Sequence, residues 1–102
     1  MSGWKPKIDI IELAEGQDYV VTRQNPLGFI ATGTTAWIEW ENGTNWDAVV
    51  LGDTVNWTIE SDQTDLIPHG TKHKTRISYP DGSVRRDYTW YYGSARRIVD
   101  EI

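Results

Sequence analysis

The sequence contains no cysteine, which removes several structural and chemical options at once. A chain without cysteine forms no disulfide framework, no thiolate zinc site and no cysteine nucleophile. With 102 residues it is expected to form one domain, residues 1–102, with a modest core. Packing and hydrogen bonding must therefore stabilise the fold.

Long apolar runs and an excess of positive charge are also missing. No segment approaches the ~20 apolar residues that cross a bilayer, and the opening MSGWKPKIDIIEL lacks the apolar run of a secretory signal. The formal charge is −5, from 15 acidic and 10 basic side chains, and a negative surface repels phosphate backbones. We expect a soluble chain made in a cytoplasm, with no membrane insertion and no nucleic-acid partner.

Groups that carry catalysis are scarce. The only histidines, His69 and His73, offer too few ligands for a zinc site. No serine has the G-x-S-x-G context of a nucleophile elbow, and Asp62 and Asp65 lack the spacing of an EF-hand loop. We therefore predict no catalytic residue, no metal, no cofactor and no enzymatic activity.

What the sequence does contain is aromatic residues in alternating patterns, with six tryptophans and five tyrosines. In DTVNWTIE, residues 53–60, Val55, Trp57 and Ile59 fall on one face of a strand. Similar segments predict strands at 8–13, 18–23, 34–40 and 46–51, and on both sides of Asp81-Gly82. Residues 95–99 are either a last edge strand or an extended tail.

Turn signals every 8–12 residues between these strands are typical of a sandwich. The predicted fold class is all-β, a single immunoglobulin-like antiparallel β-sandwich of about seven to eight strands. One short helical crossover is expected near 61–67, with Ser61 as its N-cap. The end segments 1–7 and 95–102 are candidate extended arms that contact neighbouring subunits.

Two turns set which aromatic residues face outward. A two-residue Asp81-Gly82 turn places Tyr88, Trp90 and Tyr92 on the core face and leaves Tyr91 on the other face. A three-residue loop, Asn42-Gly43-Thr44, pairs Ile38 with Ala48 and turns Trp37 away from the core.

Outward aromatic and basic side chains are the candidate contact residues. For Trp4 and Trp37 the alternatives are a protein contact, a sugar platform or burial under the termini. A basic stripe at Lys72, Lys74 and Arg76, and later arginines, either keep strand edges solvated or contact a neighbouring subunit. The predicted subunit interface consists of Trp4, Trp37, Tyr91, Arg96 and Arg97.

Three segments in succession resemble one known family. They are GTTAWIEWENGTNWDAVV, VNWTIESDQTDLIPHGTKHKTRISYPDG and YTWYYGSARRI. Their order, from about residue 8 to residue 98, is similar to that of the LtfC-like β-sandwich proteins of tailed phages, many of which infect actinobacteria.

The resemblance implies a small structural protein of the virion with no catalytic residues. In related siphophages such sandwiches form a collar around the tail tube, so the implied function is a minor tail protein of a collar or tail-tip ring. The implied partners are other virion proteins, namely tail-tube, tail-tip or capsid subunits, and further copies of the chain in a symmetric assembly. The alternatives are a capsid decoration or head–tail joining protein, and a carbohydrate-binding sandwich that contacts the host envelope.

Overall fold

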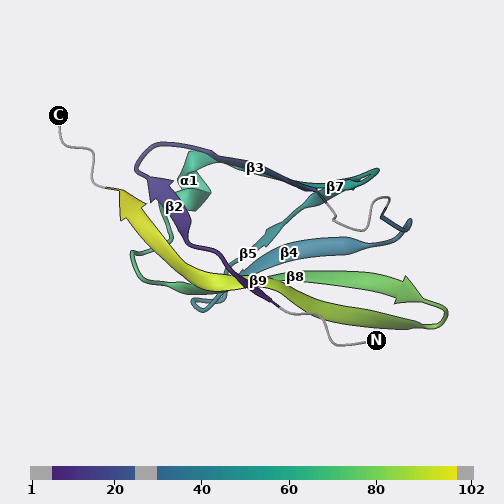
Figure 1. Cartoon of the computed structure of the whole chain (residues 1–102). Helices are drawn as coiled ribbons and strands as arrows, with labels where there is room; N and C mark the ends of the chain where they lie inside the picture. Colours follow the sequence, from purple (N-terminus) through teal and green to yellow (C-terminus); the bar gives the residue numbers. More distant parts are fainter. Residues whose placement is uncertain (1–5, 25–29, 99–102) are drawn as a thin grey trace.

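The chain folds as a β-sandwich in a computed structural model that describes residues 6–24 and 30–98 (Figure 1). This confirms the predicted all-β sandwich. In chain order the elements are β1 (Lys7–Ile8), β2 (Ile11–Ala14), β3 (Tyr19–Gln24), β4 (Thr35–Trp40), β5 (Asn45–Asp47), β6 (Val49–Leu51), β7 (Thr54–Ile59), α1 (Ser61–Thr64), β8 (Lys72–Asp81) and β9 (Val84–Ile98).

The strands form two sheets. One has the order β1-β9-β8-β4-β5, with β2 also paired to β9, and the other has the order β3-β7-β6. The two sheets lie as a lower and an upper layer in Figure 1. This order matches an immunoglobulin-like arrangement in which β3, β7 and β6 correspond to strands B, E and D, and β5, β4, β8 and β9 to C′, C, F and G.

The first strands depart from the antiparallel expectation. Both β1 and β2 run parallel to β9, with Lys7 opposite Tyr91 and Ile11 opposite Ala95. Parallel pairing has no local turn signal, because its partners are far apart in sequence. Residues 95–98 are therefore the paired end of β9 and not an arm, and Lys7 also lies in a strand.

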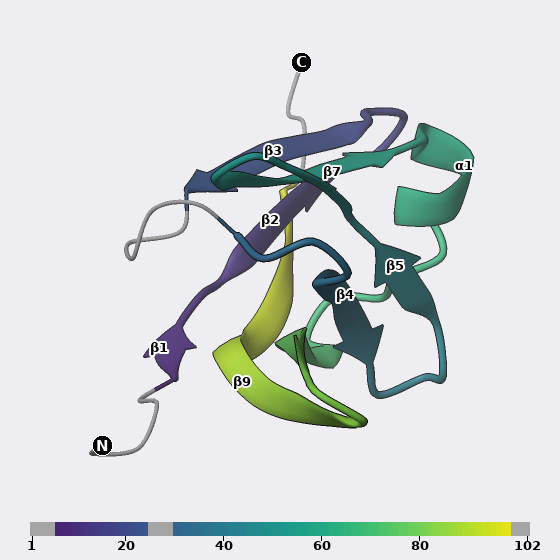
Figure 2. The ribbon, with the colours of Figure 1, turned by 90° about the vertical axis from the view of Figure 1, so that its right-hand side faces the viewer.

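The predicted strand at 46–51 divides between the two layers. Residues 45–47 pair with β4 in one sheet, and residues 49–51 pair with β7 in the other. Ala48 joins the two pieces and donates a backbone hydrogen bond of 2.9 Å to Ala36. Figure 2 shows β5 rising on one side of the sandwich, where the chain passes between the layers.

The core lies between the sheets and is rich in tryptophan. The Trp57 indole is 1% exposed and donates a 3.0 Å hydrogen bond to the backbone carbonyl of Trp46. The Trp46 ring lies 4.9 Å from that of Trp40, measured between centroids. Edge-to-face packing of this kind adds stabilisation beyond burial alone. The buried apolar residues are Ile11, Leu13, Ile30, Ala36, Ile38, Trp40, Trp46, Val55, Trp57, Ile67, Ile77, Trp90 and Ala95.

The β8–β9 hairpin has a different register from the predicted one. Asp81 pairs with Val84, so the turn consists of Gly82 and Ser83. The strand pairing is shifted by two residues from the predicted pairing, and a shift of two leaves Tyr88 on the predicted face. A β-bulge then interrupts the ladder, because Arg76 pairs with Thr89 whereas Thr75 pairs with Tyr91. Beyond the bulge every side chain of β9 changes face.

The bulge reverses the prediction for the two adjacent tyrosines. Trp90, the extra residue, stays buried at 4% exposure. Tyr91 turns inward and packs against the core, and Tyr92 turns outward and is 44% exposed. The predicted facing of Tyr91 and Tyr92 was wrong because alternation was carried through the bulge.

The β4–β5 loop has the predicted three-residue length but a different position. Ile38 pairs with Trp46 and not with Ala48, so the loop consists of residues 41–43. The shift is two residues, which leaves the facing of each side chain as predicted. Ile38 points into the core at 1% exposure, and Trp37 lies on the opposite face.

The short helical crossover is present and joins the two sheets. α1 follows β7 of the three-stranded sheet, and the chain then enters β8 of the other sheet. Its N-cap is Glu60 and not Ser61, and the Ser61 N–H instead donates to the Asp18 carboxylate at 2.7 Å. Ile67 is buried at 1% exposure, whereas Leu66 is exposed.

Candidate functional site

The outer face of the six-stranded sheet gathers aromatic and charged side chains from four neighbouring strands, β5, β4, β8 and β9. We define this outer face by residues that point away from the core, which are Trp37, Glu39, Glu41, Asp47, Lys72, Lys74, Arg76, Thr89 and Tyr92. They alternate with buried residues such as Ile38 and Trp40 along β4, as the pleat requires.

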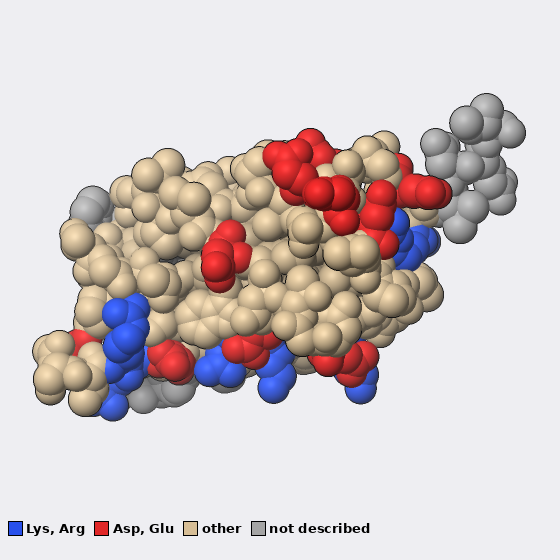
Figure 3. Space-filling view, turned by 180° about the vertical axis from the view of Figure 1, so that it is seen from behind, with Lys and Arg blue, Asp and Glu red and all other residues tan. Residues whose placement is uncertain are grey.

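The charges on the outer face form two adjacent stripes of opposite sign. The basic stripe is Lys72, Lys74 and Arg76 along β8, and the acidic stripe is Glu39 and Glu41 at the end of β4. Register places Lys74 opposite Glu39, and a 2.9 Å backbone hydrogen bond places Lys72 opposite Glu41. Figure 3 shows basic and acidic side chains side by side along the lower edge of the molecule.

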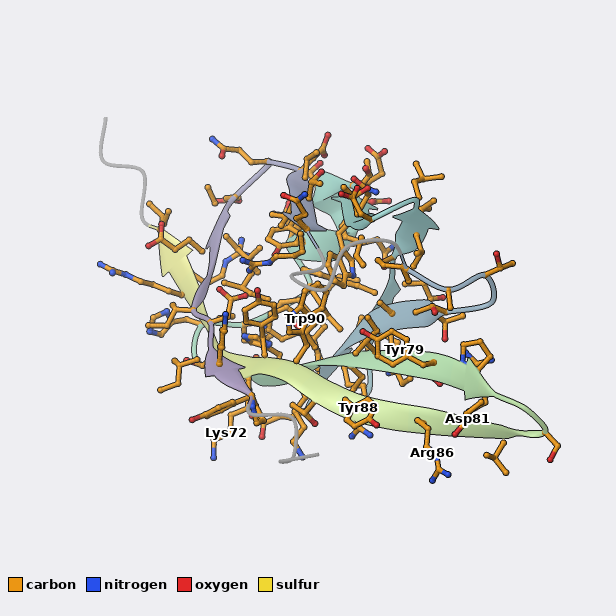
Figure 4. All side chains as sticks on the ribbon, turned by 45° about the vertical axis from the view of Figure 1, so that its right-hand side comes forward. Lys72, Tyr79, Asp81, Arg86, Tyr88 and Trp90 are labelled. Atoms are coloured by element: carbon orange, nitrogen blue, oxygen red, sulfur yellow. The ribbon has the colours of Figure 1, made fainter. Side chains whose placement is uncertain are left out.

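No ion pair within residues 6–24 and 30–98 neutralises these stripes. The ion pairs among the described residues are Arg23–Asp9, Arg86–Asp81 and Arg97–Asp65, none of which involves the stripes. In Figure 4 Lys72 points away from the sandwich, in contrast to Trp90, which points between the layers. The five charges of the two stripes are therefore available for contacts outside the described part of the chain.

Trp37 lies in the outer face as predicted, between Arg76 on β8 and Asp47 on β5. Its indole N–H donates a 2.8 Å hydrogen bond to the Glu39 carboxylate, which fixes the ring against the sheet. The Nε atom of Arg76 is buried and has no hydrogen-bond partner in the described residues. Trp37 and Arg76 thus place an aromatic ring fixed by a hydrogen bond beside a guanidinium group with an unsatisfied donor.

A shallow hollow of about 410 Å³ opens at the end of the outer face. Its walls include Glu39, Lys74 and the exposed ring of Tyr92, and its lining is completed by Trp40, Glu41, Lys72, His73 and Gly93. The hollow lies at the boundary between the two charge stripes. Its exposed lining is mainly apolar, with charged side chains at the rim, and it is open rather than enclosed.

Tyr91, a predicted interface residue, is instead part of a contact between the two layers. The Arg23 guanidinium on β3 lies 4.4 Å from the centroid of the Tyr91 ring, within the range of a cation–π contact. Arg23 also forms a 2.7 Å ion pair with Asp9, which lies between β1 and β2. The Tyr91 ring is therefore occupied by a contact within the chain.

In the same region the backbone of Asp9 passes close to Gly93 of β9. A Cβ atom at Gly93 would overlap the Asp9 carbonyl oxygen, so the position accommodates only glycine without a shift. Across Gly93, the His73 ring donates from Nε2 to that carbonyl over 2.8 Å. Burial lowers the pKa of His73, although the hydrogen bond to Asp9 opposes the effect, and the neutral imidazole is favoured.

Tyr19 belongs to the same region between the layers. Its ring centroid lies 5.5 Å from that of Trp46, and burial and the nearby Asp9 charge raise the pKa of Tyr19 to about 12. The shifted pKa values of Tyr19 and His73 follow from burial in the structure. The Asp9 carboxylate acts on both residues and is itself paired with Arg23 at 2.7 Å.

The two predicted C-terminal arginines differ in their surroundings. Arg96 is exposed, opposite Glu12, and no ion pair involves it among the described residues. Arg97 is half-buried and donates to the backbone carbonyl of Thr64 at 2.8 Å and to the Asp65 carboxylate at 3.4 Å. Arg97 thus stabilises the crossover. Trp4 lies outside the described residues, so its predicted role is untested.

Acidic side chains gather at the end of the molecule that carries α1 (Figure 3). Two of them satisfy backbone donors, since Asp18 accepts from Ser61 and Asp65 accepts from Gly16 at 3.1 Å. Within residues 6–24 and 30–98, no cluster of histidine and acidic side chains could hold a metal ion. No helix in this part of the chain is long and apolar enough to cross a membrane.

The outer face includes functional candidates that sequence reasoning missed. Tyr92 was assigned to the core, and Glu39 and Glu41 were not connected with the basic stripe. The signal for the stripes was present as alternate charged residues in WIEWE and KHKTR, but only the pairing of β4 with β8 brings them together. The signal for Tyr92 was hidden by the bulge.

Comparison with known proteins agrees with this fold. A search among curated proteins found no sequence that matches the chain. A family model described as the LtfC-like β-sandwich domain matches residues 5–98, which include nearly the whole chain. The family indicates a phage-related structural protein. The chain is a member of the LtfC-like β-sandwich family.

Proposed function

We propose that the chain is a non-enzymatic structural component of a tailed-phage virion, a minor tail protein that forms a collar or tail-tip ring. The observation that carries the proposal is the family match over residues 5–98. Because the match spans both sheets and the crossover, it concerns the whole sandwich and not one motif.

The surface supports a role in assembly. The outer face carries Trp37, Tyr92 and Arg76, residue types that are enriched in protein interfaces, together with charges of both signs that form no ion pair among the described residues. Its partners would be tail-tube, tail-tip or capsid subunits and other copies of the chain, with the virion as its location. No cofactor is required for such a role.

Immunogold labelling of intact phage particles with an antibody against the chain tests this proposal. The collar or tail-tip role predicts label at one end of the tail. Label over the head would contradict the tail position and favour a capsid decoration or head–tail joining protein. Absence of the chain from both intact and denatured particles, with the purified chain as the positive control for the antibody, would contradict the virion role altogether.

A further inference from the structure

The arrangement of charge on the outer face is complementary to itself. Consider a two-fold axis that lies in the plane of this face and runs parallel to the strands between β4 and β8. Rotation about that axis stacks two copies face to face and places β8 of one copy over β4 of the other. The basic stripe of each copy then meets the acidic stripe of its partner. The two-fold symmetry produces this contact between opposite charges twice in the dimer.

The β4–β8 register predicts the individual contacts between the two copies. A rotation about an axis parallel to the strands does not move a residue along the strand direction, so residues that are opposite each other in one chain face each other across the dimer. Glu39 lies opposite Lys74 in the chain, so it faces Lys74 of the partner subunit. By the same rule Glu41 faces Lys72 of the partner subunit. Each contact occurs twice, and none of these side chains has an ion pair among the described residues.

The row of Trp37 is also complementary under the same rotation. Trp37 and Arg76 are direct cross-strand neighbours, so the rotation places each Trp37 ring over Arg76 of the partner subunit. A guanidinium over an indole face is a favourable contact when water is excluded. It would also change the surroundings of the Arg76 Nε atom, which is buried without a hydrogen-bond partner in the described residues.

We propose that two copies of this chain associate face to face through the outer face of the six-stranded sheet, about a two-fold axis between β4 and β8. This inference concerns the chain itself and does not depend on the virion role. Four strands about 4.8 Å apart and about six residues long give a patch of roughly 400 Å² in plan. Two such patches bury roughly 800 Å² in total, below the ~1,200 Å² of stable specific interfaces, so the dimer is expected to be weak and concentration-dependent.

Sedimentation velocity of the purified chain over a range of concentrations tests the proposal. The wild type should convert reversibly from monomer to dimer, and high salt should weaken the dimer because it screens the stripes. Lys74→Glu and Glu39→Lys should each weaken self-association by roughly tenfold or more, since each places like charges in both symmetric contacts. Lys7→Glu changes the net charge as Lys74→Glu does but lies in β1, off the outer face, and should leave the dimer intact.

A mixing experiment separates contacts between chains from effects within one chain. The Lys74→Glu variant is negative at both positions 39 and 74, and the Glu39→Lys variant is positive at both. A heterodimer of the two variants therefore has opposite charges in both intermolecular contacts. A heterodimer should therefore form from variants that do not form homodimers. A wild type that stays monomeric would overturn the proposal. So would a dimer unaffected by Lys74→Glu, or a mixture that does not associate.

Discussion

At the scale of single residues, Gly93 holds the meeting point of three strands. It pairs with His73 on β8, and the segment between β1 and β2 passes over it at Asp9. Asp9 in turn pairs with Arg23 of the other sheet. The contact between the two layers at this end therefore depends on the absence of a side chain at position 93.

Gly93→Ala should destabilise the fold. The new methyl group would overlap the Asp9 carbonyl, so the β1–β2 connection must move and weaken the His73 hydrogen bond. We expect a loss of about 1–3 kcal/mol in the free energy of unfolding, measured by urea denaturation. Ser94→Ala, at the next position of β9, is the control and should cost far less. Equal stability of the two variants would show that the close approach has no energetic role.

His73 should make stability depend on pH in the acidic range. Its pKa is lowered in the folded chain, so the unfolded chain binds more protons between the two pKa values and stability falls as the pH decreases below about 6.5. His73→Gln should flatten that part of a plot of unfolding free energy against pH. A slope unaltered by His73→Gln would contradict this assignment.

At the scale of elements, the β-bulge at Trp90 determines which tyrosine faces outward. Alternation along YTWYYG predicted the facing of Tyr88 correctly, because that residue lies before the bulge. It predicted Tyr92 inside and Tyr91 outside, and both predictions were wrong because these residues lie after the bulge. A bulge depends on how two strands pair, so the pattern of one strand does not reveal it. By contrast, the alternation of residues 54–59 predicted the facing of β7 correctly, because that strand is regular throughout.

The crossover after β7 depends on one of two adjacent arginines. Arg97→Met removes hydrogen bonds to the carbonyl of Thr64 and to Asp65, and should cost about 1–3 kcal/mol in unfolding free energy. Arg96→Met, on the exposed side of the same strand, should cost less than about 0.5 kcal/mol. Thermal or urea unfolding of the two variants measures the difference. Equal costs would mean that Arg97 does not support the crossover.

At the scale of the whole molecule, the sequence was sufficient to predict the two-layer sandwich and its helical crossover. It was not sufficient to predict the parallel pairing of β1 and β2 with β9, which brings residues 7–14 beside residues 91–98. Nor could it assemble the outer face, because Glu39 and Lys74 are distant in sequence and become neighbours only through the β4–β8 register. The candidate surface is thus a property of topology rather than of a motif.

The central claim is that the chain is a virion subunit whose outer face is covered by a neighbour. Hydroxyl-radical labelling of Tyr92, compared between the dilute purified chain and intact particles, tests this most directly. Tyr92 is 44% exposed in the single chain and should become strongly protected in the particle, while Leu66, exposed beside α1, serves as the reference. Equal labelling of Tyr92 in both samples, or absence of the chain from purified particles, would contradict the claim.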